Sequence, residues 1–128
     1  MTIQQAVMTY ARDNLANNNL HYATAPKTVE PPYIVMMTVS APREDTHEGP
    51  DGLVEVRLQF DWYAKTYQAV LSDFTAARLL FAGYQGLMGN ESDNVWVAGC
   101  EIADEGDGYE SDVKLYRKTM DLLIKYEE

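Results

Sequence analysis

The fold of this chain is decided by the stretch Val54-Glu55-Val56-Arg57-Leu58-Gln59-Phe60-Asp61-Trp62. Apolar and polar residues alternate through it without a break, which is the period of two that a β-strand imposes on its side chains. One face of this strand is therefore expected to be buried and the other exposed, as in an antiparallel sheet that is covered on one side.

Two amphipathic segments are expected to cover the buried face. Thr2 can cap a helix that runs to about Ala16, and Thr66 can cap a second helix over residues 67–82. Apolar residues recur along one side of each segment at helical spacing. Gly83 is a plausible stop for the second helix, because glycine readily adopts the left-handed conformation that ends many helices.

Further strands are expected on either side of these elements. Residues 33–39 are rich in strand-forming types, and residues 95–102 form a second apolar run. The last segment, 113–126, is ambiguous from its residues alone. Tyr116, Met120, Leu123 and Tyr126 suit a helix, whereas alternate residues from Tyr116 to Tyr126 suit a strand.

The remaining segments are predicted to be irregular. Residues 21–32 contain three prolines, residues 41–52 form a long polar loop, and residues 103–112 form an acidic loop with two glycines. A loop with Gly86 and Gly89 precedes the 95–102 strand. The expected fold is a single α+β domain over residues 1–128, with one mostly antiparallel β-sheet of about four strands and two α-helices packed on one face.

Charge limits the range of partners. The chain of 128 residues has 20 acids, 10 bases and a formal net charge of −10. No Lys, Arg or His lies between Leu79 and Val113, where eight acids fall. Such a surface repels phosphate, so specific nucleic-acid binding is disfavoured. No apolar run approaches a membrane span, and the start lacks the basic and apolar parts of a secretory signal.

Few residues have the pattern of catalytic or metal-binding groups. His21 and His47 both fall in expected loops, without a second His or Cys at ligand spacing. Cys100 alternates with Ala98 and Ile102, which favours a small buried residue over a nucleophile. The acidic loop has glycines where an EF-hand needs oxygen ligands, so a flexible turn is favoured over a calcium site. No catalytic residue, metal or cofactor is expected.

Three stretches in order carry a family resemblance. They are residues 32–36 after the proline-rich loop, residues 51–67 through the alternating strand into a helix, and residues 107–121, from Asp107-Gly108-Tyr109-Glu110 to Leu115-Tyr116-Arg117-Lys118-Thr119-Met120-Asp121. In this order and spacing the chain resembles the tail-completion proteins of long-tailed phages, which are also called tail terminators or head–tail joining proteins. The resemblance covers nearly the whole chain.

This resemblance implies a non-enzymatic virion protein. It implies a subunit of a sixfold ring that caps the tail tube, contacts the major tail tube protein and docks on the head-completion or neck protein. It also implies that the last segment is a strand. The expected location is the head-proximal end of the tail, with the host cytoplasm before assembly. DNA passes through such a ring without sequence-specific binding, and no membrane contact is expected.

The two long polar loops are the expected sites of interface or lumen contacts. The candidate residues are Arg43, Glu44, Asp45, His47, Glu48, Asp104, Glu105, Asp107 and Glu110. Carboxylates that face the lumen would repel DNA phosphates and let DNA slide through; an outer acidic rim is the alternative. Two other classes stay open: a neck or head-completion adaptor, and a small cytoplasmic binding domain or an enzyme that uses the acidic loop and a metal.

Overall fold

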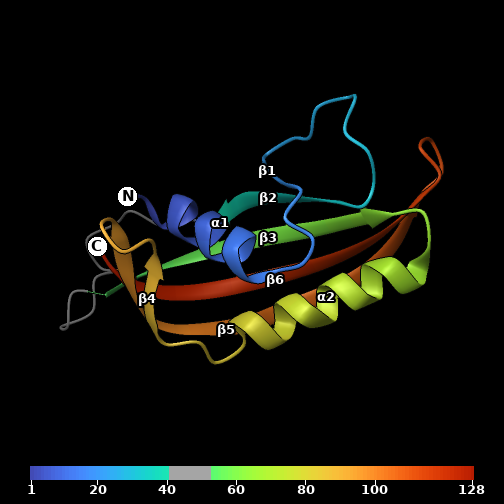
Figure 1. The fold of residues 1–128 in the computed structure, drawn as a ribbon. Helices are drawn as coiled ribbons and strands as arrows, with labels where there is room; N and C mark the ends of the chain where they lie inside the picture. The colour runs from blue at the N-terminus through green and yellow to red at the C-terminus, as the bar shows by residue number, and fades with distance from the viewer. Residues whose placement is uncertain (41–52) are drawn as a thin grey trace.

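The computed structural model describes residues 1–40 and 53–128, which form two helices and one six-stranded sheet (Figure 1). The helices are α1 (Ile3–Asn14) and α2 (Tyr67–Phe81). The strands are β1 (Leu20–Tyr22), β2 (Tyr33–Ser40), β3 (Leu53–Ala64), β4 (Gly86–Gly89), β5 (Asn94–Glu110) and β6 (Leu115–Glu127). Within the described ranges, neither helix is long and apolar enough to cross a membrane.

The sheet has the order β1-β2-β3-β6-β5-β4. β1 pairs with β2 in parallel, and every other neighbouring pair is antiparallel. The expected α+β class and mostly antiparallel sheet are therefore confirmed, but the expectation of about four strands is wrong. The two additional strands, β1 and β4, are three and four residues long, and each lies at an edge of the sheet.

β3 lies between β2 and β6 and has the burial pattern that its alternating residues predict. Val54, Val56, Leu58, Phe60 and Trp62 are all at most 9% exposed. The intervening residues turn to the opposite face, where Glu55, Arg57 and Gln59 stay partly exposed. β6 continues the pattern, because Phe60 pairs with Met120 and Val56 with Ile124. A continuous apolar face therefore extends across the middle strands.

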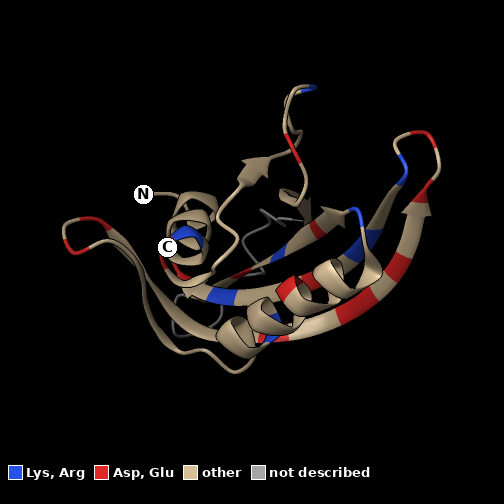
Figure 2. Ribbon diagram, turned by 45° about the vertical axis from the view of Figure 1, so that its right-hand side comes forward, with Lys and Arg blue, Asp and Glu red and all other residues tan. Residues whose placement is uncertain are grey.

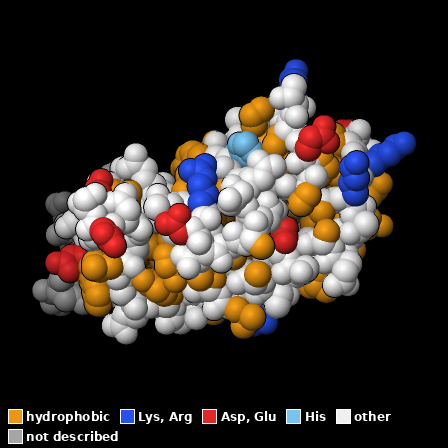
Figure 3. Space-filling view, viewed as in Figure 1, with side chains coloured by type: hydrophobic (Ala, Val, Ile, Leu, Met, Phe, Trp, Pro, Cys, Tyr) orange, Lys and Arg blue, Asp and Glu red, His pale blue; other side chains and the backbone are white. Residues whose placement is uncertain are grey.

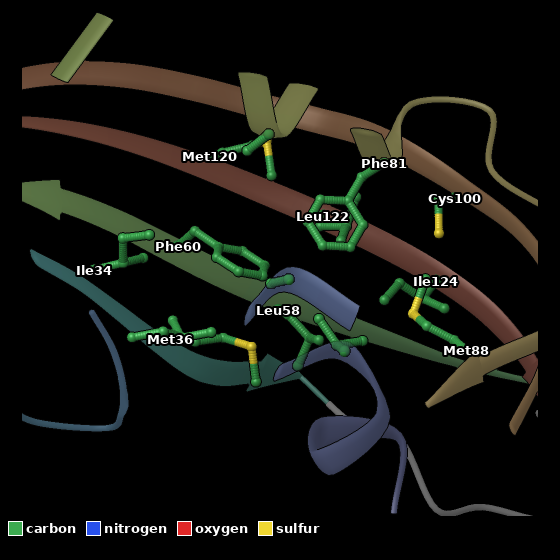
Figure 4. Packing of buried hydrophobic residues seen from close by; sticks show 14 of the residues in the cluster. Ile34, Met36, Leu58, Phe60, Phe81, Met88, Cys100, Met120, Leu122 and Ile124 are labelled. Atoms are coloured by element: carbon green, nitrogen blue, oxygen red, sulfur yellow. The ribbon is translucent and has the colours of Figure 1, made fainter. Parts of the chain in front are cut away.

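Both helices pack on this apolar face, as predicted (Figures 1 and 4). Thr2 caps α1 in a reciprocal capping box with Gln5, and the Thr66 side chain accepts a hydrogen bond from the Ala69 N–H at 3.2 Å. The Tyr10 ring of α1 lies 5.9 Å from the Phe81 ring of α2. One shared core thus joins the two helices to the sheet, which leaves the other face without a helix in the described chain.

Three irregular segments of the sequence-based prediction are strands in the structure. His21 lies in β1, which pairs with Ile34–Met36; residues 86–89 form β4; and residues 103–110 belong to β5. These segments have weak local strand patterns, and backbone pairing with a neighbouring strand determines their conformation. The ambiguous last segment is the strand β6, as the family resemblance implied. The predicted 41–52 loop lies outside the described residues.

The one-sided core predicts that substitutions on the two faces of β3 differ strongly in their effect on stability. Phe60 is fully buried and its ring lies 5.6 Å from both the Trp62 and the Phe81 rings, so Phe60→Ala should destabilise the protein by about 3–5 kcal/mol. Glu55→Ala, on the opposite face, should change the free energy of unfolding by less than about 0.5 kcal/mol. Urea unfolding followed by circular dichroism measures both, and equal losses would contradict the one-sided core.

Candidate functional site

The acidic segment of the sequence lies along one edge of the sheet. Asp104, Glu105, Asp107 and Glu110 were expected in a flexible loop, but they lie in β5, which pairs with β6 as far as Glu110 opposite Leu115. Figure 2 shows these acids as a red series along the strand. The connection to β6 is confined to residues 111–114 and stands at the end of the sheet away from the termini (Figure 1).

The outer edge of β5 is open over most of its length. β4 pairs only with Asn94–Val97, and the N–H of Gly83 donates to the carbonyl of Cys100 at 3.0 Å. Beyond Cys100, no described segment pairs with the outer side of the strand. Residues 103–107 are all exposed. β5 therefore has a free edge, here defined as residues 101–110.

Register divides the acids of the free edge between the two faces of the sheet. Asp104 pairs with Asp121 and Glu101 with Leu123, which places both on the face without helices, here called the open face. Glu105 pairs with Met120, a core residue, and so lies on the helix-covered face. The register shifts between Ile102 and Asp104, and this shift determines which of the acids lies on which face.

On the helix-covered face, Asp107 joins β5 to β6 and α2. Its Oδ1 lies 3.0 Å from Nζ of Lys118, whose side chain is only 8% exposed. Lys118 Nζ also lies 4.6 Å from the centre of the Phe74 ring, and Tyr67 donates a hydrogen bond to Asp107 at 3.4 Å. Although burial alone would lower the pKa of Lys118, the hydrogen bond and charge of Asp107 raise it above its ordinary value. The buried ammonium group is thus held in its charged form.

Three tyrosines lie beside this ion pair, and the sequence-based prediction missed their grouping. The Tyr116 ring is 4.9 Å from Tyr109 and 6.2 Å from Tyr67, and all three are exposed by 37% or more. They come from β6, β5 and α2, so only the pairing of these elements brings them together. Had residues 103–110 been predicted as a strand, the spacing of Asp107 and Tyr109 would have placed both on the same face of the sheet.

The open face carries polar pairs that join neighbouring strands. Asp61 is 7% exposed and accepts hydrogen bonds from Thr119 Oγ1 at 2.5 Å and Gln59 Nε2 at 3.0 Å. Arg57 Nη1 lies 3.4 Å from Asp121 Oδ2. These groups neutralise or hydrogen-bond one another. By contrast, no ion pair of Asp104 is found in the described ranges.

At the hairpin end of the open face, Arg117 packs against Gly108. Arg117 Nη1 lies 3.2 Å from Glu110 Oε1, and a Cβ on Gly108 would come within 3.2 Å of the guanidinium. The Arg117 side chain therefore lies against the backbone of β5, and a larger residue at position 108 would require the guanidinium to shift slightly. Tyr33 and Tyr63 stack nearby with their rings 5.0 Å apart, and burial raises the pKa of both.

Among the described residues, those considered for chemistry lie apart from one another. Cys100 is buried beside Ile124 and Met88 (Figure 4), and burial raises its thiol pKa to about 12. His21 lies on β1, and its Nε2 is 2.8 Å from Oδ1 of Asn19, which precedes the strand. Across residues 1–40 and 53–128, no group of three or more His, Cys, Asp or Glu is arranged to hold a metal ion. The candidates Arg43, Glu44, Asp45, His47 and Glu48 lie outside the described residues.

A small cavity lies where the chain after α1 passes α2. Its volume is about 100 Å³, and Leu15, Ile34 and Trp62 supply much of its apolar lining. Asn17 donates to Asp73 Oδ2 at 2.8 Å beside it. Among the described residues that line it, Asp73 is the one ionisable group.

The Asp107–Lys118 pair predicts that Asp107 and Asp104, two acids of β5, contribute differently to the stability of the fold. Asp107→Asn should lower the pKa of Lys118 and the free energy of unfolding by about 1 kcal/mol, because a charged partner of a buried ammonium is lost. Asp104→Asn should have almost no effect. The raised pKa of Lys118 stabilises the fold at pH values below the pKa of an unfolded lysine. The full difference in the free energy of unfolding between the wild type and Asp107→Asn is therefore expected at pH 7, and this difference should shrink above pH 10.5. Urea unfolding at several pH values measures this, and equal effects of the two variants would contradict it.

Comparisons with known proteins give a structural likeness. No protein-family model matches the chain, and no curated protein matches its sequence. One similar solved structure is a chain described as "Virion of native gene transfer agent (GTA) particle", with a TM-score of 0.63 and 9% sequence identity. The alignment covers 86% of this chain and 79% of that chain. At this identity, the comparison establishes that the two chains share a fold.

Proposed function

We propose that this chain is a structural subunit of a phage-like virion, and that it acts as a tail-completion protein. The observation that carries the proposal is a fold shared, over 86% of the chain, with a chain of a gene transfer agent virion. The ordered motifs that resemble tail-completion proteins support the same role independently of that fold.

The proposed unit is a ring, sixfold by family resemblance, between tail tube and head. Its partners are further copies of this chain, the major tail tube protein and the head-completion or neck protein. The role depends on shape and surface contact, and no bond is made or broken. A rigid core with a free strand edge and a projecting hairpin suits a subunit that binds neighbours on several sides.

The open face is the proposed lining of the channel. It carries Asp104 and Glu101 on β5. Of its cations, Arg57 and Arg117 are each paired with a carboxylate, and Lys125 lies opposite Glu55. Figure 3 shows the opposite side of the molecule, on which the two helices lie, with a few Lys and Arg side chains among the polar and apolar ones. A wall on which acids outnumber cations repels DNA phosphates and holds them weakly.

Loss of the protein should leave tails incomplete. We expect particles assembled without it to contain over-long tails or tails without heads, because an uncapped tube neither stops growing nor joins the neck. Electron microscopy of the lysate measures tail length and head attachment. Normal virions would contradict the proposal. Binding of the purified protein to isolated heads and not to isolated tails would instead favour the neck adaptor.

The two faces of β5 predict a difference in DNA ejection. Asp104→Lys should slow ejection by placing a cation on the proposed lumen wall, whereas Glu105→Lys, on the helix-covered face, should leave it near the wild-type rate. Asp107 is kept in both variants because it holds Lys118.

Ejection kinetics from purified particles with equal tail lengths provide the measurement. Equal rates for both variants and the wild type would show that Asp104 does not face the DNA. Slowing by Glu105→Lys alone would place the other face in the lumen.

A further inference from the structure

The sheet has a second free edge on the side opposite β5. β1 pairs only with Ile34–Met36, so the outer side of Met37–Ser40 has no backbone partner in the described chain. Met37 and Val39 are 37% and 49% exposed, so the side chains beside this edge are apolar. This β2 edge and the free edge of β5 flank the same four strands, β2, β3, β6 and β5.

Backbone hydrogen bonds indicate that the β2 edge is available for pairing. The Ile34 N–H donates to Asn19 and the Met36 carbonyl accepts from Ala23, so these alternate residues direct their backbone groups outward. By the same alternation, Thr38 directs its N–H and carbonyl outward beyond the end of β1. Gln4 and Tyr22 hydrogen-bond the Thr38 side chain at 3.1 and 2.7 Å, and the register of β2 with β3 shifts between Thr38 and Ser40.

Charge distinguishes the two ways in which free edges can meet. If β5 paired with β5 of another copy, Glu101, Asp104 and Glu105 would lie among the same carboxylates, and facing like charges destabilise a strand pair. The described part of the β2 edge carries no charge from Met37 to Ser40. Pairing of β5 with β2 therefore avoids the repulsion that opposes the symmetric contact.

We propose that copies of this chain associate head to tail by pairing the free edge of β5 with the β2 edge of the next copy. Such a contact uses two different surfaces, so it closes into a ring when the rotation between copies allows it, and it does not stop at a dimer. The sheet then continues from copy to copy, and the open faces form one continuous wall. The inference deepens the proposed ring role, and it rests on that role only for its biological setting.

A charge introduced at Met37 tests the proposed contact, because Met37 is exposed. Its cross-strand partner is Gln59, so it lies on the open face. In the proposed contact it lies on the same face as Glu101 and Asp104 of the neighbouring copy. Met37→Glu should weaken association about five-fold and Met37→Lys should strengthen it about five-fold, since opposite and like charges across strands act with opposite sign. High salt should reduce the difference. The same pair of changes at Leu79, 70% exposed on α2, is the matched control and should have no effect.

Sedimentation of the purified protein over a concentration series measures association, and hydrogen exchange locates the contact. Association with opposite effects of the two Met37 variants, and with slower exchange in both 37–40 and 101–110, would support the proposal. Slower exchange in 101–110 alone would indicate symmetric β5 pairing and overturn it. Association that protects neither segment, or no association up to millimolar concentration, would also overturn it. Because tails are not used, these outcomes are independent of the loss-of-protein phenotype.

Discussion

Burial of one face of β3 is the constraint on which the rest of the structure depends. Five alternating apolar side chains of this strand are buried, and both helices bury their apolar sides against the same face of the sheet. β2 and β6 pair with the two sides of β3 over many residues. Because paired residues share a face of the sheet, the buried face of β3 also determines which side chains of β2 and β6 are buried. The open face, the free edges and the projecting hairpin are consequences of that single choice.

β5 gives the molecule its asymmetry. At its start the strand is covered by β4 and enters the core at Val97 and Cys100, whereas from Glu101 onward it is an exposed edge with acids on both faces. Unpaired strand edges invite uncontrolled pairing, and charged residues are a usual protection. The same acids can therefore keep the free chain from pairing with itself and still permit contact with an uncharged edge.

Side-chain pairs make the open face and the hairpin rigid. Asp61, Arg57 and Arg117 each bond across to a neighbouring strand, and Lys118 joins the base of the hairpin to α2 through Asp107 and Phe74. A subunit whose role is shape needs such rigidity, because a loosely held edge would lose more conformational entropy when it binds.

The sequence alone determined the features that depend on local pattern: β3, both helices with their Thr2 and Thr66 caps, and the burial of Cys100. Only the tertiary structure decided that residues 103–110 form a strand, because their glycines and acids give a weak local signal and the pairing partner is β6. It also decided which acids face which side. The register shifts between Ile102 and Asp104, and no residue type in the sequence marks the position of this shift.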